Sequence, residues 1–118
     1  MNILGIDYGD GKCGIAMARG SLAEPFATVD SKSALAVVID LAHKHQITEI
    51  VVGDCPKEFL IGLQSLMIPV HQADETLSSF DARQSLMHTT QKRRRENEHA
   101  VAAAIILQNW LDSRPQKV

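Results

Sequence analysis

The chain has 118 residues, of which 45% are hydrophobic and 22% are charged, an ordinary composition for a single globular domain. Its net charge of -2 excludes a protein that binds nucleic acid through overall positive charge, so such binding would need a local basic patch. No apolar run approaches the ~20 residues that span a bilayer, and the two distant cysteines lack metal-site spacing. We therefore expect a cytoplasmic protein with reduced thiols and no membrane partner.

The first half of the chain predicts four strands and one helix. Apolar and β-branched runs predict strands at residues 2–7, 13–18, 24–30 and 47–53. The first two strands flank the glycine-rich turn "GDGK", which is typical of a hairpin. Apolar residues at helical spacing predict a helix that begins at Asp30 or Ser31 and ends near His45.

The second half predicts alternation of helices with one more strand. We expect a short helix or turn at 56–67, a fifth strand at 68–74, a helix at about 79–88, a polar basic loop at 89–95 and a last helix from Glu96 to Asp112. The order β-β-β-α-β-α-β-α-α predicts an α/β fold with a mixed five-stranded sheet flanked by helices. We assign residues 1–112 to one domain and 113–118 to a flexible tail.

Acidic residues stand where the predicted strands end. Asp7 closes the first strand, Asp54 follows the fourth, and Asp74 and Glu75 follow the fifth. Carboxyl ends of parallel strands gather functional groups, so we expect these carboxylates to converge. Converging carboxylates repel one another unless a divalent cation lies among them, and oxygen ligands suit Mg²⁺ or Mn²⁺. The alternative is that Asp7 simply forms the turn.

Four motifs carry a resemblance to a known family. The stretches "ILGIDYG", "EIVVG", "DETLSS" and "AAAIILQNWLD" occur in the order found in the YqgF family, also called RuvX. The chain resembles that family over nearly its whole length. The resemblance implies an RNase H-like fold and a metal-dependent nuclease with an acidic triad. It also implies maturation of the 5′ end of 16S rRNA, or cutting of Holliday junctions as a lesser alternative.

The resemblance carries two of the three acids onto this chain directly. The family's first aspartate falls on Asp7 and its glutamate on Glu75, where Thr76 replaces the usual arginine. The implied partners are pre-rRNA or branched DNA and ribosomal precursor particles, for a monomer or weak homodimer. The connection that follows residue 53 is shorter than in the family, which bears on substrate choice.

The third acid is missing from its usual place. The family register, eight residues before the leucine of "ILQ", falls on His99. Either Glu98 or Glu96 supplies the carboxylate, or His99 is itself a ligand, or the site is inactive. Because Mg²⁺ favours a carboxylate over an imidazole, we expect Glu98 to be the ligand and His99 to be an auxiliary ligand or proton carrier.

One dense basic run precedes the last predicted helix. The run consists of Lys92, Arg93, Arg94 and Arg95, which could hold phosphates near the cut. Three other residues could extend that surface: Gly9, Lys12 and Arg83. The glycines after Asp7 would let a phosphate backbone approach the turn. The competing interpretations are a solvated loop for the basic run and, for the whole chain, a non-catalytic RNA-binding or ribosome-assembly module.

Overall fold

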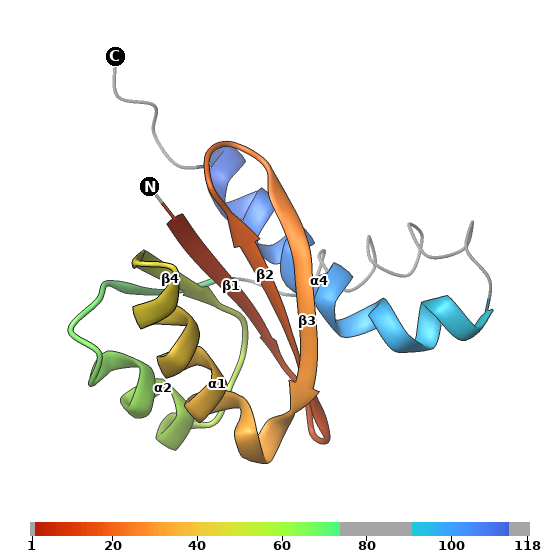
Figure 1. The fold of residues 1–118 in the computed structure, drawn as a ribbon, viewed down its shortest axis with the longest axis horizontal. Helices are drawn as coiled ribbons and strands as arrows, with labels where there is room; N and C mark the ends of the chain where they lie inside the picture. The colour runs from red at the N-terminus through yellow and green to blue at the C-terminus, as the bar shows by residue number, and fades with distance from the viewer. Residues whose placement is uncertain (1, 74–90, 114–118) are drawn as a thin grey trace.

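The computed structural model describes residues 2–73 and 91–113, which form one five-stranded mixed sheet with helices on both faces (Figure 1). The strands are β1 (Asn2–Tyr8), β2 (Lys12–Ala18), β3 (Ala23–Asp30), β4 (Ile47–Val52) and β5 (Val70–Gln72). The helices are α1 (Ser31–Lys44), α2 (Lys57–Gln64) and α4 (Gln91–Ser113).

The sheet order is β3-β2-β1-β4-β5. β1 pairs antiparallel with β2 and parallel with β4, and β4 pairs parallel with β5. This confirms the predicted hairpin and the predicted mixed five-stranded sheet. Because β1, β4 and β5 run in the same direction, their carboxyl ends share one edge of the sheet.

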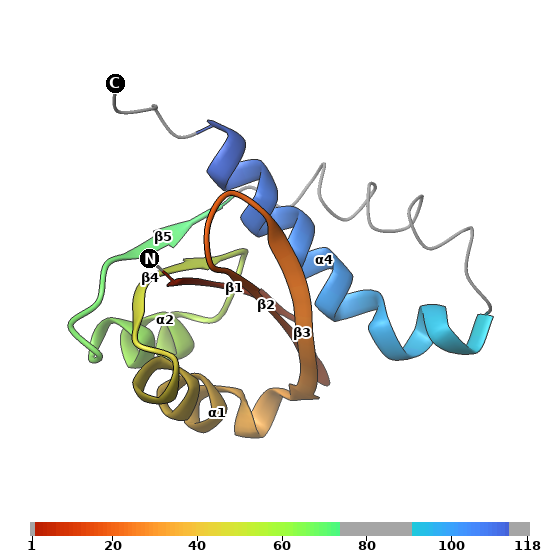
Figure 2. The same cartoon turned by 45° about the horizontal axis from the view of Figure 1, so that its top comes forward.

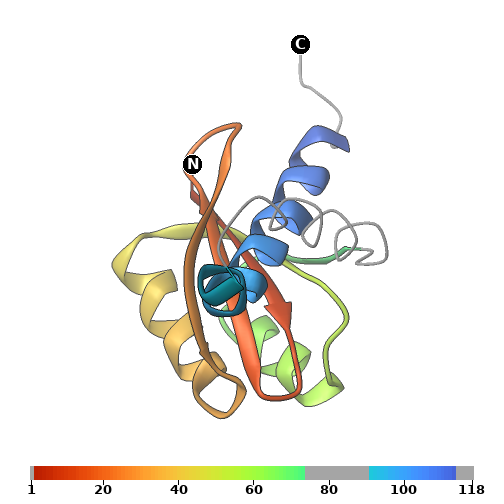
Figure 3. The same cartoon turned by 90° about the vertical axis from the view of Figure 1, so that its right-hand side faces the viewer.

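Side chains of β1 alternate between two hydrophobic cores, as a strand covered on both faces requires. Leu4 and Ile6 belong to the core under α1 and α2, whereas Ile3 belongs to the core under α4. Figures 2 and 3 show α4 crossing the sheet on the side opposite α1 and α2. The same alternation places Asp7 on the α4 side and Tyr8 on the α2 side, where its ring lies 4.7 Å from that of Phe59.

Small residues let α4 approach the sheet closely. On this face the strands carry glycine and alanine, at Gly5, Gly14, Ala16 and Ala18. The facing side of α4 carries Ala100, Ala103 and Ala104. A Cβ built on Gly14 would lie 1.8 Å from the carbonyl oxygen of His99, and one on Gly5 would lie 2.8 Å from Cβ of Leu107. The helix therefore rests on the strand backbone itself.

The beginning of α4 corrects one prediction. Residues 91–95 were expected in a basic loop, but the helix begins at Gln91 and includes the run Lys92–Arg95. Lysine, arginine, glutamine and glutamate are all good helix formers, so strong charge does not interrupt a helix. The prediction treated polarity as a sign of a loop.

Other boundaries move by smaller amounts. β5 covers only Val70–Gln72 of the predicted 68–74, and α2 is a helix of eight residues. Asp30 precedes α1 as expected, but its side chain makes no capping hydrogen bond. The predicted helix at 79–88 and the tail from residue 114 lie outside the described residues. Among the helices that are described, none has the length and apolarity needed to cross a bilayer.

Candidate nuclease site

The candidate site is built where the end of β1 meets α4. Asp7 is in register with Gly14 of β2, and it points toward the helix. Its Oδ2 lies 3.4 Å from Nδ1 of His99, a residue ninety-two positions later in the chain. The Asp7 side chain is 15% exposed and the His99 side chain 35% exposed. A shielded carboxylate and a more accessible imidazole therefore face each other at the edge where the parallel strands end.

The helix presents His99, not Glu98, to Asp7. Glu98 is exposed, while His99 is half-buried against Asp7, and the ligand role expected of Glu98 stays a prediction. Adjacent helical residues point about 100° apart, so only one of the pair can face the strand end. The family register falls on His99, the residue that faces Asp7.

The turn between β1 and β2 forms the floor beneath His99. The Gly9 amide donates to the carbonyl of Lys12 at 3.0 Å, which closes the turn. A Cβ on Gly9 would lie 3.1 Å from Cε1 of His99, so the imidazole rests against the glycine backbone. Gly9, like Gly14, makes room for α4, and the approach of a phosphate backbone to this turn stays a prediction.

Helix α1 holds this turn from the other side. The Ser31 amide donates to the carbonyl of Gly11 at 3.1 Å, and the Ser31 hydroxyl donates to the carbonyl of Gly9 at 2.6 Å. The Cys13 thiol donates to the Ser31 hydroxyl at 3.4 Å. Burial is the main cause that raises the pKa of Cys13, so it remains a thiol at neutral pH.

The basic residues predicted to bind phosphate lie in different parts of the chain. Lys12 Nζ forms an exposed ion pair with Asp30 Oδ1 at 2.6 Å, and that hydrogen bond is the main cause that lowers the pKa of Asp30. Lys12 is therefore engaged with Asp30 and not directed at the candidate site. The run Lys92–Arg95 belongs to the first turns of α4, on the same helix as His99. Arg83 lies outside the described residues.

The donors at the site suit a hard or intermediate divalent cation. A carboxylate is a good ligand for Mg²⁺ and Mn²⁺, and an imidazole is acceptable to Mn²⁺. Among residues 2–73 and 98–113, whose side chains the structure describes, no three His, Cys, Asp or Glu side chains are grouped closely enough to share an ion. Glu75, the second predicted acid, lies outside those residues. The described part of the chain thus contributes two donors, Asp7 and His99.

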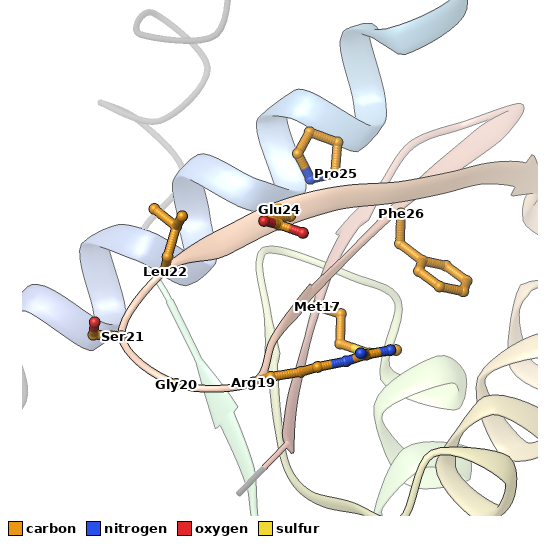
Figure 4. A pocket seen from close by; sticks show the side chains of 8 residues that line it. All are labelled: Met17, Arg19, Gly20, Ser21, Leu22, Glu24, Pro25 and Phe26. Carbon is orange, nitrogen blue, oxygen red and sulfur yellow. The ribbon is translucent and has the colours of Figure 1, made fainter.

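A cavity of about 500 Å³ lies at the opposite end of the β2–β3 hairpin (Figure 4). Its lining includes Met17, Arg19 and Phe26. Met17 is paired with Leu4, three residues before Asp7 in β1, and the hairpin leads away from Asp7 beyond that point. The cavity is therefore separate from the candidate site.

Two contributors were missed by the sequence reasoning. Ser31 was considered only as a helix cap, and nothing in the sequence pattern indicates its contact with Gly9. Gly14 did carry a signal, because glycine and alanine alternate with large residues along β2. That alternation marks a strand face that accepts a close neighbour.

Comparison with known proteins finds a family and relatives whose names describe nucleases. A family model described as "RuvX: Holliday junction resolvase" matches residues 55–113. A relative named "Putative pre-16S rRNA nuclease" from Protochlamydia amoebophila is 36% identical, with 95% of this chain and 93% of the relative covered. One of the same name from Myxococcus xanthus is 32% identical, with 96% and 89% covered.

Solved structures show the fold. RuvC from Thermus thermophilus in complex with a Holliday junction has a TM-score of 0.58 at 16% identity, over 90% of this chain and 91% of RuvC. The fowlpox virus resolvase with Holliday junction DNA has a TM-score of 0.60 at 11% identity, over 96% of this chain and 98% of the resolvase. The expected RNase H-like fold is thereby confirmed.

Proposed function

This chain belongs to the RuvX family, and from that membership we propose that it is a metal-dependent nuclease that hydrolyses phosphodiester bonds in structured RNA. The substrate we propose is the 5′ end of pre-16S rRNA, after the names of relatives that match nearly the whole chain. The observation that carries the proposal is the placement of Asp7, at the end of β1, against His99 of α4.

Each group of the site has a role in this proposal. The Asp7 carboxylate and the His99 imidazole would hold Mg²⁺ or Mn²⁺, with Glu75 as the further carboxylate. The bound ion would supply activation of a water molecule and stabilisation of the leaving oxygen. Asp7 is largely shielded from solvent, which strengthens its attraction for a cation. His99 is more accessible, so its imidazole can exchange protons with solvent.

His99→Ala is expected to lower the cleavage rate about 10–100-fold, the usual cost of losing a group that supports a metal site. Glu98→Gln should stay within about twofold of the unmodified protein, because Glu98 points to solvent and a rim group contributes little. Cleavage of a 5′-labelled pre-16S fragment in Mg²⁺ and in Mn²⁺ measures both. His99→Asp, which restores the family's acid, should remain active in Mg²⁺. A larger loss from Glu98→Gln than from His99→Ala would return the ligand role to Glu98.

The basic run is proposed to hold phosphates beside the cut. Lys92 and Arg95 precede His99 by seven and four residues, the spacing at which helical residues share one face. Replacing both with glutamine should weaken RNA binding equally for all sequences and reduce the salt slope by about 0.7–0.9 per lost phosphate contact. Binding measured at several salt concentrations gives both quantities.

The matched control removes two other positive charges from the same part of the helix. Arg93→Gln with Arg94→Gln should have the smaller effect on the salt slope. Equal slopes before and after the Lys92 and Arg95 replacements would assign the run to a solvated surface.

A second candidate function is supported by His99 itself. An imidazole in place of the third acid is the departure that an RNA-binding or ribosome-assembly module without catalysis would show. The unmodified protein distinguishes the two when it is assayed on pre-16S RNA and on a four-way DNA junction with both metals. Cleavage of the junction alone would support a resolvase-like DNA nuclease, and retained RNA binding without any cleavage would support the module.

A further inference from the structure

We propose that Ser31, at the start of α1, is a positioning residue that acts through Gly9 to hold His99 against Asp7. The inference rests on the proposed function for its kinetic consequence, but its structural part concerns only this chain. Ser31 touches neither Asp7 nor His99 in the contacts described above; it binds the turn on which His99 rests.

The first step is the hydrogen bond from the Ser31 hydroxyl to the Gly9 carbonyl, at 2.6 Å. Ser31 is half-buried, so this bond competes less with water than an exposed one would. The hydroxyl also accepts from the Cys13 thiol, which leaves it one preferred orientation. A donor held from both sides fixes the Gly9 carbonyl more firmly than a freely rotating hydroxyl would.

The second step is the contact between Gly9 and the imidazole. The space that a Cβ on Gly9 would fill is closed by Cε1 of His99 at 3.1 Å and by Nδ1 at 3.5 Å. The same Nδ1 faces Asp7 Oδ2 at 3.4 Å. A displacement of Gly9 would therefore shift the His99 imidazole, whose Nδ1 faces the Asp7 carboxylate. This links a residue beside the α1 core to the site beneath α4.

The backbone hydrogen bond of Ser31 allows its hydroxyl to be tested by itself. The Ser31 amide donates to the Gly11 carbonyl independently of the side chain, so Ser31→Ala keeps that bond and removes only the two hydrogen bonds of the hydroxyl, the one to Gly9 and the one from Cys13. Ser31→Thr retains a hydroxyl and serves as the conservative variant. Ser33→Ala is the matched control, because Ser33 is exposed on the same helix and undergoes the same chemical change.

Two measurements on the full-length protein separate positioning from general stability. The first is the nuclear Overhauser contact between His99 Hε1 and the Gly9 α-protons, which needs neither substrate nor metal. We expect this contact to weaken in Ser31→Ala and to persist in Ser31→Thr and Ser33→Ala. The second is RNA cleavage, in which Ser31→Ala should lower kcat about tenfold with KM within about twofold, because a misplaced group affects the reacting geometry more than binding.

The outcomes are distinguishable from failure of the proposed nuclease. An unchanged Overhauser contact in Ser31→Ala overturns the inference whether or not the protein cleaves RNA. A lost contact with unchanged kcat also overturns it, since Ser31 would then be structural only. If the unmodified protein cleaves nothing while the contact is lost in Ser31→Ala, the nuclease proposal fails and the positioning of His99 by Ser31 stands.

Discussion

Asp7→Asn will abolish cleavage while the fold is retained. The replacement keeps the volume of the side chain and a group that can face His99, but it removes the negative charge that attracts a cation. We expect the rate to fall at least a hundredfold, since even groups that only support metal ligands cost about 10–100-fold when removed. Glu75→Gln, at the second acid of the motif, should have a comparable effect.

The matched control for this experiment is Asp10→Asn. Asp10 lies three residues later, exposed in the same turn, and undergoes the same chemical change. Its cleavage rate should stay near that of the unmodified protein, and the thermal midpoints of both variants should stay close to it. A normal cleavage rate for Asp7→Asn in the presence of Mn²⁺ would refute the role of Asp7.

Gly14→Ala is expected to destabilise the protein strongly, because the added methyl group would face α4. The added Cβ would lie 1.8 Å from the carbonyl oxygen of His99 and 2.0 Å from its carbonyl carbon. Both are backbone atoms, so no side chain can rotate away and the whole helix must lift from β2. We expect the free energy of unfolding to fall by about 3 kcal/mol or more, at the upper end of the cost of overpacking.

Gly11→Ala provides the control with the opposite expected sign. Nothing lies within 4 Å of a Cβ at Gly11, and its φ is not in the left-handed region. Alanine there should be neutral or stabilise by about 0.4–1 kcal/mol, because it reduces the entropy of the unfolded chain. Urea unfolding of both variants measures the difference. Similar midpoints for the two would mean that α4 does not press on Gly14.

The sequence by itself was sufficient for the architecture. The β-branched runs predicted the strands near their observed positions, and the hairpin turn and the β/α alternation predicted the mixed sheet. It also made Asp7 a candidate, because acidic residues stand at the ends of several predicted strands. The family motifs gave two further candidate positions, Glu75 and His99.

The pattern of polar and apolar residues did not predict the helix at the start of α4, because polarity alone does not determine backbone conformation. The run Lys92–Arg95 looked like a loop because it has no apolar periodicity, yet its residues favour a helix. Periodicity also left the choice between Glu98 and His99 open, since apolar residues follow both at helical spacing. The preference of Mg²⁺ for carboxylates then pointed to Glu98, which the structure places in solvent.

Only the tertiary structure decided which residue faces Asp7. The rotation of α4 about its axis is set by its closest contact, where the backbone at His99 meets Gly14. Gly14 is the partner of Asp7 in the sheet, so the helix touches β2 beside the carboxylate and His99 turns toward it. A contact between residues so far apart in the chain leaves no periodic signal. Asp7 could therefore be singled out from the sequence, but its pairing with His99 depended on how closely two backbones can pack.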